Sequence, residues 1–215
     1  MYPQKILTMK IERVVRSEHK AERILVFLTG GELLRVSEND ALRFGLKAGL
    51  ELDAETLDAL RGAGRRSGIR AKAAEIIGRR PLSRSELLRR LREKGASEEE
   101  AEDAADWLAA YGVLDDADYA ARLAEHYRNR GYGAARIRAE LRKRGVPQEL
   151  WDAAEQETES DTLAAFLQSK CRTGLPTDEK ERRRLVQSLR RRGFSWEEIR
   201  TALGDMEENT EFLEE

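Results

Sequence analysis

The sequence predicts a mainly α-helical protein, built from tandem three-helix repeats that follow a small N-terminal β region. Two observations predict this fold class. Basic and acidic segments alternate along the chain with a period of roughly fifty residues, which is typical of a repeat. A leucine-led basic segment that ends in glycine also recurs, and its glycines, Gly95, Gly145 and Gly193, lie 50 and 48 residues apart. Three short helices with a tight turn between the second and third resemble helix-turn-helix modules.

The first sixty residues differ from the rest because they contain short β-rich segments. Two such segments, 23–28 and 32–36, are separated by a turn that contains Gly30 and Gly31. Adjacent glycines tolerate positive φ and favour a tight hairpin. We therefore expect a β-hairpin or a three-stranded element within residues 1–60.

Short helices and a linker are expected to complete this region. Ser37 is placed to cap a helix over residues 37–44, because its hydroxyl can accept a hydrogen bond from a free backbone N–H. Residues 54–60 read as a second helix. The segment 61–68 carries three glycines among basic residues, and we expect it to be the linker to the repeats.

From residue 69 onward, only helix is predicted. Three repeats are expected over 69–114, 115–160 and 161–204, followed by an acidic tail over 205–215. The expected helices are roughly 70–79, 84–94 and 98–110, then 116–129, 134–144 and 148–157, then 161–171, 178–192 and 196–203. Capping boxes at Ser83, Ser97 and Ser195 mark helix starts, and a left-handed glycine follows the second helix of each repeat.

The second helix of each repeat carries a basic face. In the middle repeat, Ala134, Ile137 and Leu141 share one face at 100° per residue, whereas Arg136 and Lys143 lie opposite. Arginine suits phosphate because its planar guanidinium can donate two parallel hydrogen bonds. The candidate binding residues are Arg89, Arg90, Arg92, Lys94, Arg130, Tyr132, Arg136, Arg138, Arg142, Lys143, Arg144, Arg183, Arg190 and Arg191.

Several interpretations of these residues stay open from the sequence alone. The arginines could form a row of anion-binding surfaces, or solvated helix faces with local ion pairs whose charge complements the helix dipole. An acidic protein would attract the same stripe as nucleic acid. Tyr132 could stack on a base or pack in a turn. The tryptophans Trp107, Trp151 and Trp196 are interpreted as packing residues.

Composition argues against several classes of protein. Charged residues make up 37% of the 215 residues and aromatic residues 6%, which predicts a thin core without a deep enzymatic pocket. One cysteine, Cys171, and two histidines argue against disulfides and metal clusters. We expect no enzyme activity, cofactor, metal, membrane span or secretory signal, and a monomer in the cytoplasm.

Specific motifs resemble the RecX regulatory proteins. Residues 112–120, 128–133 and 136–146 are similar to the middle repeat of that family, and residues 79–87 and 192–199 are similar to its flanking repeats. The N-terminal part and the acidic tail carry the weaker likeness.

The resemblance implies both a shape and a partner. It implies tandem repeats in an elongated, curved molecule. It also implies a non-enzymatic modulator that lodges on the filament of the RecA recombinase and limits its ATPase, strand-exchange and co-protease activities. Some members of the family also bind single- or double-stranded DNA directly. The alternatives are a stand-alone helix-turn-helix-like DNA-binding protein and an α-solenoid scaffold for protein partners only.

Overall fold

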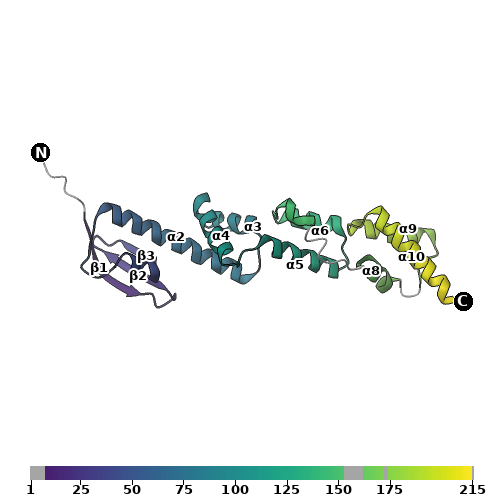
Figure 1. Ribbon diagram of the computed structural model, residues 1–215, viewed down its shortest axis with the longest axis horizontal. Coiled ribbons are helices and arrows are strands. Elements are labelled where there is room, and N and C mark those ends of the chain that lie inside the picture. Colours follow the sequence, from purple (N-terminus) through teal and green to yellow (C-terminus); the bar gives the residue numbers. More distant parts are fainter. Residues whose placement is uncertain (1–7, 153–161, 172–173, 215) are drawn as a thin grey trace. The chain divides into compact units, whose positions relative to one another are not determined.

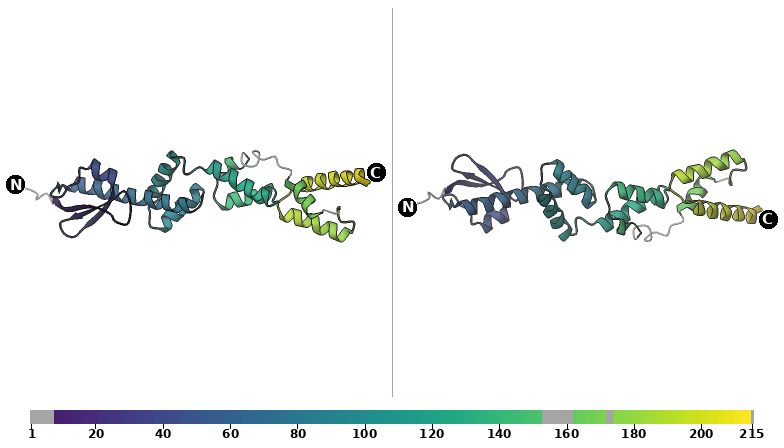
Figure 2. Two further views of the ribbon diagram at one scale, coloured as in Figure 1. Left: turned by 90° about the horizontal axis from the view of Figure 1, so that it is seen from below. Right: turned by 90° about the horizontal axis from the view of Figure 1, so that it is seen from above.

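The computed structural model describes residues 8–152, 162–171 and 174–214. The chain forms two compact units. One contains the residues up to Arg80 together with Leu87–Leu114, and the other contains Pro81–Glu86 together with the residues from Asp115 onward. Strands occur near the N-terminus and helices make up most of the rest (Figures 1 and 2). The predicted fold class, mainly helical with a small N-terminal strand region, is therefore confirmed.

The N-terminal strands form one antiparallel sheet in the order β3-β2-β1-β4. Its strands are β1 (Met9–Arg16), β2 (Arg23–Leu28), β3 (Leu33–Ser37) and β4 (Glu51–Leu52). Gly30 and Gly31 have φ values of 91° and 86°, so the expected hairpin between β2 and β3 is confirmed. The sheet has one strand more than the expected three-stranded element, because the short β4 pairs with the start of β1.

The core of the sheet lies on one face. Ile24, Val26 and Leu28 alternate along β2 and are buried, as period-two geometry requires. They pack in one cluster with Leu57 and Leu60 of the following helix. The short helix α1 (Glu38–Arg43) begins at the predicted cap, where the Ser37 hydroxyl accepts from the Asp40 N–H at 3.0 Å.

Helix α2 (Ala54–Arg79) runs without a break from the sheet into the first repeat. The linker predicted at residues 61–68 is therefore wrong, and the expected helices over 54–60 and 70–79 are parts of α2. A Cβ on Gly64 would lie 2.7 Å from the Arg35 carbonyl oxygen and 3.2 Å from Val36 Cγ1. Gly64 thus lets the helix approach β3 closely, so at this position glycine serves packing and not a turn.

The rest of the first repeat consists of α3 (Arg84–Glu93) and α4 (Glu98–Ala110). The capping box predicted at Ser97 is present, since Ser97 and Glu100 each accept a hydrogen bond from the other's backbone N–H. Helix α4 also pairs with α2, because Arg70 donates two hydrogen bonds of 3.0 Å to the Asp103 carboxylate. Trp107 is half-buried beside this pair.

The middle repeat contains α5 (Asp116–Asn129), α6 (Ala134–Lys143) and the 3₁₀ turn η1 (Gln148–Leu150). Ile137 and Leu141 of α6 are buried together with Trp151, as expected from the helical pattern. The helix expected over 148–157 begins instead as this 3₁₀ turn, and residues 153–157 lie outside the described residues.

The third repeat contains α8 (Thr162–Lys170), α9 (Glu179–Arg191) and α10 (Trp196–Glu214). The predicted capping box at Ser195 is present, with Glu198 as its partner. Helix α10 continues through Glu214, so the helix end expected at residue 203 is wrong, and residues 205–214 of the expected acidic tail are helical. Trp196 is 60% exposed, contrary to its expected packing role, because Ile199 and Leu203 provide the buried face of α10.

Two equivalent contacts join elements within the second unit, and we call them the repeat joints. In each joint, the start of one repeat's second helix meets the turn after the next repeat's second helix. In the first joint, the Ser83 hydroxyl donates to the Arg144 carbonyl. In the second, the Gly133 N–H donates to the Arg192 carbonyl at 2.9 Å, and the Ala135 N–H donates to the Gly193 carbonyl at 3.1 Å.

The glycines at these joints permit close contact with a neighbouring segment, and the turn glycines also have a left-handed backbone. Gly145 and Gly193 have φ values of 65° and 94°, which side chains rarely adopt. A Cβ on Gly145 would lie 2.6 Å from Ser85 Cβ, and a Cβ on Gly193 would lie 2.4 Å from the Arg136 nitrogen. Gly133 has an ordinary φ, yet its Cβ would lie 2.7 Å from the Gly193 carbonyl carbon. The first joint therefore brings the Gly145 backbone against a serine side chain, and the second brings two backbones into close contact.

One carboxylate is buried in the middle repeat. Glu140 is 7% exposed, and it accepts hydrogen bonds from Arg144 at 2.7 Å and from Arg136 at 3.0 Å. Burial by itself would raise the pKa of Glu140. The hydrogen bond from Arg144 and the positive charges of Arg144, Arg136 and Lys143 outweigh burial and hold this pKa below its usual value.

Glu140→Gln is expected to lower the free energy of unfolding by about 1–2 kcal/mol at pH 7, because it leaves two guanidiniums without their carboxylate. A carboxyl whose folded-state pKa is lowered stabilises the fold above its unfolded-state pKa of about 4.3, and this contribution is lost as the pH falls through the folded-state pKa. In urea unfolding, the difference between wild type and variant should therefore shrink as the pH falls below about 4.3 and vanish below the lowered folded-state pKa. The exposed Glu125→Gln on α5 is the control, and an equal effect there would contradict the assignment.

Gly133→Ala is expected to lower the melting temperature, because overpacking against the Gly193 backbone costs about 1–3 kcal/mol. Gly78→Ala on α2 is the matched control. Its Cβ meets nothing within 4 Å, so it should stabilise the helix by about 0.5–1 kcal/mol. Differential scanning calorimetry measures both, and a neutral Gly133→Ala would show that the second repeat joint is not tightly packed.

Candidate polyanion-binding surface

The basic face of α6 is exposed as expected. Arg142 and Lys143 lie on the side away from the buried Ile137 and Leu141. Between the flanking cations, Ala135 and Ala139 are also exposed. Small side chains at the centre of a basic face allow a polyanion to approach the helix closely.

One arginine occupies an equivalent exposed position in all three repeats. Arg92, Arg142 and Arg190 each stand three residues before the turn glycine, and we call them the last-turn arginines. Arg142 lies over the Trp151 ring at 5.1 Å, and Arg92 donates to Glu98 at 3.2 Å. Arg190 forms no ion pair with any part of the chain that the structure describes. Their position near a helix C-terminus is favourable for a cation.

Several other candidates pair with carboxylates on the same helix. Arg89 bonds Glu93 and Arg183 bonds Glu179, each one helical turn away. Exposed pairs of this kind contribute only about 0.3–0.5 kcal/mol. A phosphate that accepts two hydrogen bonds from the same guanidinium can replace such a carboxylate at little cost. These pairs leave the arginines available to a polyanion.

Two candidates are used inside the second unit. The Arg144 side chain is 27% exposed and bonds the buried Glu140. The Tyr132 ring lies 5.5 Å from the Tyr127 ring and 5.1 Å from the Arg192 guanidinium. Arg192 in turn donates to the Arg130 and Gly131 carbonyls at 3.0 and 3.1 Å. This placement favours the interpretation that Tyr132 packs in a turn.

The remaining candidates differ in exposure. Arg90 is half-buried, whereas the exposed ones are Lys94, Arg130, Arg136, Arg138, Lys143 and Arg191. Helix α9 also exposes Lys180 and Arg184, which are not among the binding residues predicted from the sequence. Lys180, Arg184 and Arg191 lie at helical spacings of four and seven residues on the face opposite Leu189. A helical wheel centred on Leu189 would have identified both.

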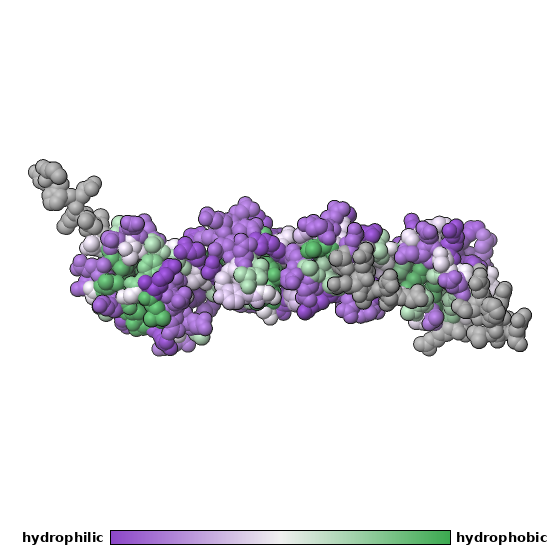
Figure 3. Space-filling view, in the orientation of Figure 1, coloured by the Kyte–Doolittle hydropathy of each residue, from purple (hydrophilic) through white to green (hydrophobic). Residues whose placement is uncertain are grey.

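The face of the molecule in Figure 3 is mostly hydrophilic over the helical repeats, as a charged binding surface requires. Within the described ranges, no helix is long and apolar enough to cross a bilayer. The same ranges contain no group of three His, Cys, Asp or Glu residues that could hold a metal ion.

Comparison with protein families matches each repeat in order. The first three-helix domain of RecX matches residues 70–108, the second matches residues 115–154 and the third matches residues 157–203. A regulatory protein RecX from Pseudomonas entomophila is 38% identical over 134 residues, which cover 61% of this chain and 86% of that protein. A second one, from Halorhodospira halophila, is 32% identical over 146 residues, which cover 66% of this chain and 91% of that protein.

Solved structures share the fold. A crystal structure of a regulatory protein RecX superposes with a TM-score of 0.71 at 23% identity, over 92% of this chain and 99% of that chain. RecX from Lactobacillus salivarius superposes with a TM-score of 0.58 at 19% identity, over 67% of this chain and 98% of that chain. The three domain matches and the sequence relatives together show the family. The chain belongs to the RecX family of regulatory proteins.

Proposed function

We propose that this protein is a non-enzymatic regulator of the RecA recombinase, which binds the RecA–DNA filament in the cytoplasm as a monomer. It limits the ATPase, strand-exchange and co-protease activities of RecA, and through them it regulates homologous recombination, DNA repair and the SOS response. The observation that carries the proposal is the ordered match of three RecX domains, each with an exposed last-turn arginine on its second helix.

The spacing of the basic helices suits a filament that repeats its own surface. A recombinase–DNA filament presents the same groups at regular intervals, and its DNA contributes phosphates. Arg92, Arg142 and Arg190 occupy the same position in successive repeats, so each repeat offers an equivalent cation. We assign the main filament contacts to these arginines, with the other exposed candidates on the second helices beside them. An acidic surface of RecA is the alternative receptor for the same cations.

The proposal is tested by titrating the protein into RecA that hydrolyses ATP on single-stranded DNA. Wild type should slow hydrolysis at near-stoichiometric or lower amounts. Arg142→Glu combined with Arg190→Glu should need at least about tenfold more protein for the same inhibition, because two phosphate contacts become repulsive. These residues are preferable to Arg136, which bonds the buried Glu140 and lies at a repeat joint.

The matched control is Lys170→Glu combined with Arg200→Glu. Both side chains are exposed on other helices of the same unit, and the charge change is identical. This control should inhibit within twofold of wild type. No inhibition by wild type at any ratio would overturn the proposal, and equal losses in both variants would overturn the assignment of the last-turn arginines.

A stand-alone DNA-binding protein is the second candidate, favoured by the exposed basic faces of α6 and α9. It predicts tight binding to duplex DNA without RecA, measured by fluorescence anisotropy. If the protein neutralises about six phosphates, its affinity should fall roughly a thousandfold between 50 and 200 mM salt. Undetectable or salt-insensitive binding would remove this candidate and leave the regulation of RecA untouched.

A further inference from the structure

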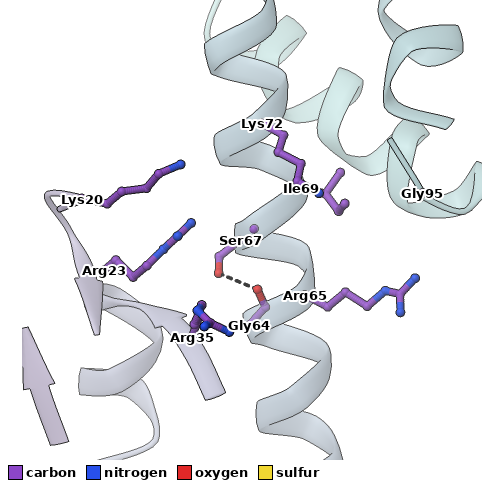
Figure 4. Close-up of a pocket in the computed structure, with 10 residues that line it drawn as sticks. Lys20, Arg23, Arg35, Gly64, Arg65, Ser67, Ile69, Lys72 and Gly95 are labelled. Carbon is purple, nitrogen blue, oxygen red and sulfur yellow. Dashed lines mark hydrogen bonds between the residues drawn. The ribbon is translucent and has the colours of Figure 1, made fainter. Parts of the chain in front are cut away.

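A basic hollow lies in the N-terminal unit, outside the second helices of the repeats. Its volume is about 390 Å³, and it lies between the sheet, helix α2 and the turn at Gly95 (Figure 4). Five cationic side chains line it: Lys20, Arg23, Arg35, Arg65 and Lys72. The matched RecX domains begin at residue 70, so most of these residues lie outside them.

The charge in the hollow is not balanced by its own lining, which contains no carboxylate among the described residues. Arg65 bonds Glu100 of α4. Within the described ranges, Lys20, Arg23, Arg35 and Lys72 form no ion pair. Like charges gathered around one concave space repel each other and create a positive potential that attracts an anion.

The secondary structure holds these cations in place. Arg23 and Arg35 lie on the adjacent, paired strands β2 and β3. Arg65 and Lys72 are seven residues apart on α2, so they share one helix face. The close approach of Gly64 to β3 brings the helix and the strands together. In Figure 4, Lys20 and Arg23 lie on the strand side of α2, and Arg65 extends from the other side of this helix.

The turn at Gly95 differs from its counterparts in the other repeats. Gly145 and Gly193 are each covered by the start of another helix at a repeat joint. Gly95 has the same left-handed backbone, with a φ of 88°, yet a Cβ there would meet nothing within 4 Å. The position that a helix N-terminus fills at the joints is therefore open at Gly95, and it faces the basic hollow.

We propose that this hollow binds the phosphate backbone of a single-stranded nucleic acid. A flexible strand can place its phosphates into a concave space, whereas a duplex presents them on a rigid convex surface. This inference does not rest on the regulation of RecA proposed above.

The test measures binding of the full-length protein to a fluorescent oligothymidylate by anisotropy, without RecA. Lys20→Gln combined with Lys72→Gln should weaken binding about tenfold and reduce the slope of log affinity against log salt by about 1.4, since each single-strand phosphate contact contributes about 0.7. The matched control is Lys10→Gln combined with Lys47→Gln. Both lysines are exposed in the same unit and do not line the hollow.

Each outcome of this assay supports or contradicts binding of the oligonucleotide at the hollow. The control should bind within twofold of wild type, and circular dichroism should show that all variants are folded. Equal weakening in both double variants, or no binding by wild type at low salt, would overturn the inference. Stronger competition by a duplex of equal length would overturn the single-strand assignment.

Free nucleotide and inorganic phosphate are further competitors in the same assay. Displacement of the oligonucleotide by ATP or phosphate at low concentration would indicate a small-anion site and overturn the inference. The binding assay contains no RecA. Its outcome is therefore independent of whether the protein inhibits the ATPase activity of RecA.

Discussion

Close approach of a helix start to a glycine turn is the constraint on which the second unit depends. At both repeat joints, a helix begins against the turn that ends another helix, and a turn carbonyl accepts a hydrogen bond from that start. The first residues of a helix have N–H groups without intrahelical partners, and the last have carbonyls without them. At the second joint, the N–H groups of Gly133 and Ala135 donate to turn carbonyls. The unpaired donors at one helix start thus bond the unpaired acceptors at another helix end. A side chain at Gly193 or Gly133 would hold these backbones apart.

The same turns decide which basic residues face solvent. Arg144 and Arg192 directly precede the turn glycines, and their side chains fold back onto Glu140 or onto Phe166 and the Gly131 carbonyl. The last-turn arginines stand two residues earlier and project outward. The proposed binding role and the structural role are thus separated by position within a single helical turn. The favourable effect of positive charge at a helix C-terminus applies to both.

The N-terminal unit uses a glycine for another purpose. Gly64 sits inside a helix, where glycine usually weakens the structure, and it lets α2 lie against β3. One unbroken helix therefore supports the sheet at its start and the first repeat at its end. The basic hollow results from this arrangement, because cations from the strands and from the helix, far apart in the sequence, line it together.

The sequence by itself determined the features that depend on local chemistry. The glycine hairpin at Gly30, the capping boxes, the left-handed turn glycines and the buried faces of the second helices all follow from backbone preference and helical periodicity. Only the tertiary structure decided the features that depend on approach between distant segments. Glycine in 61–68 reads as a linker unless the neighbouring strand is known, and α10 continues past residue 203 although its later residues are acidic. Packing likewise decides whether Arg144 faces solvent or Glu140, and whether Lys20 and Lys72 line the same hollow. No local sequence pattern specifies the distance between residues that are far apart in the chain.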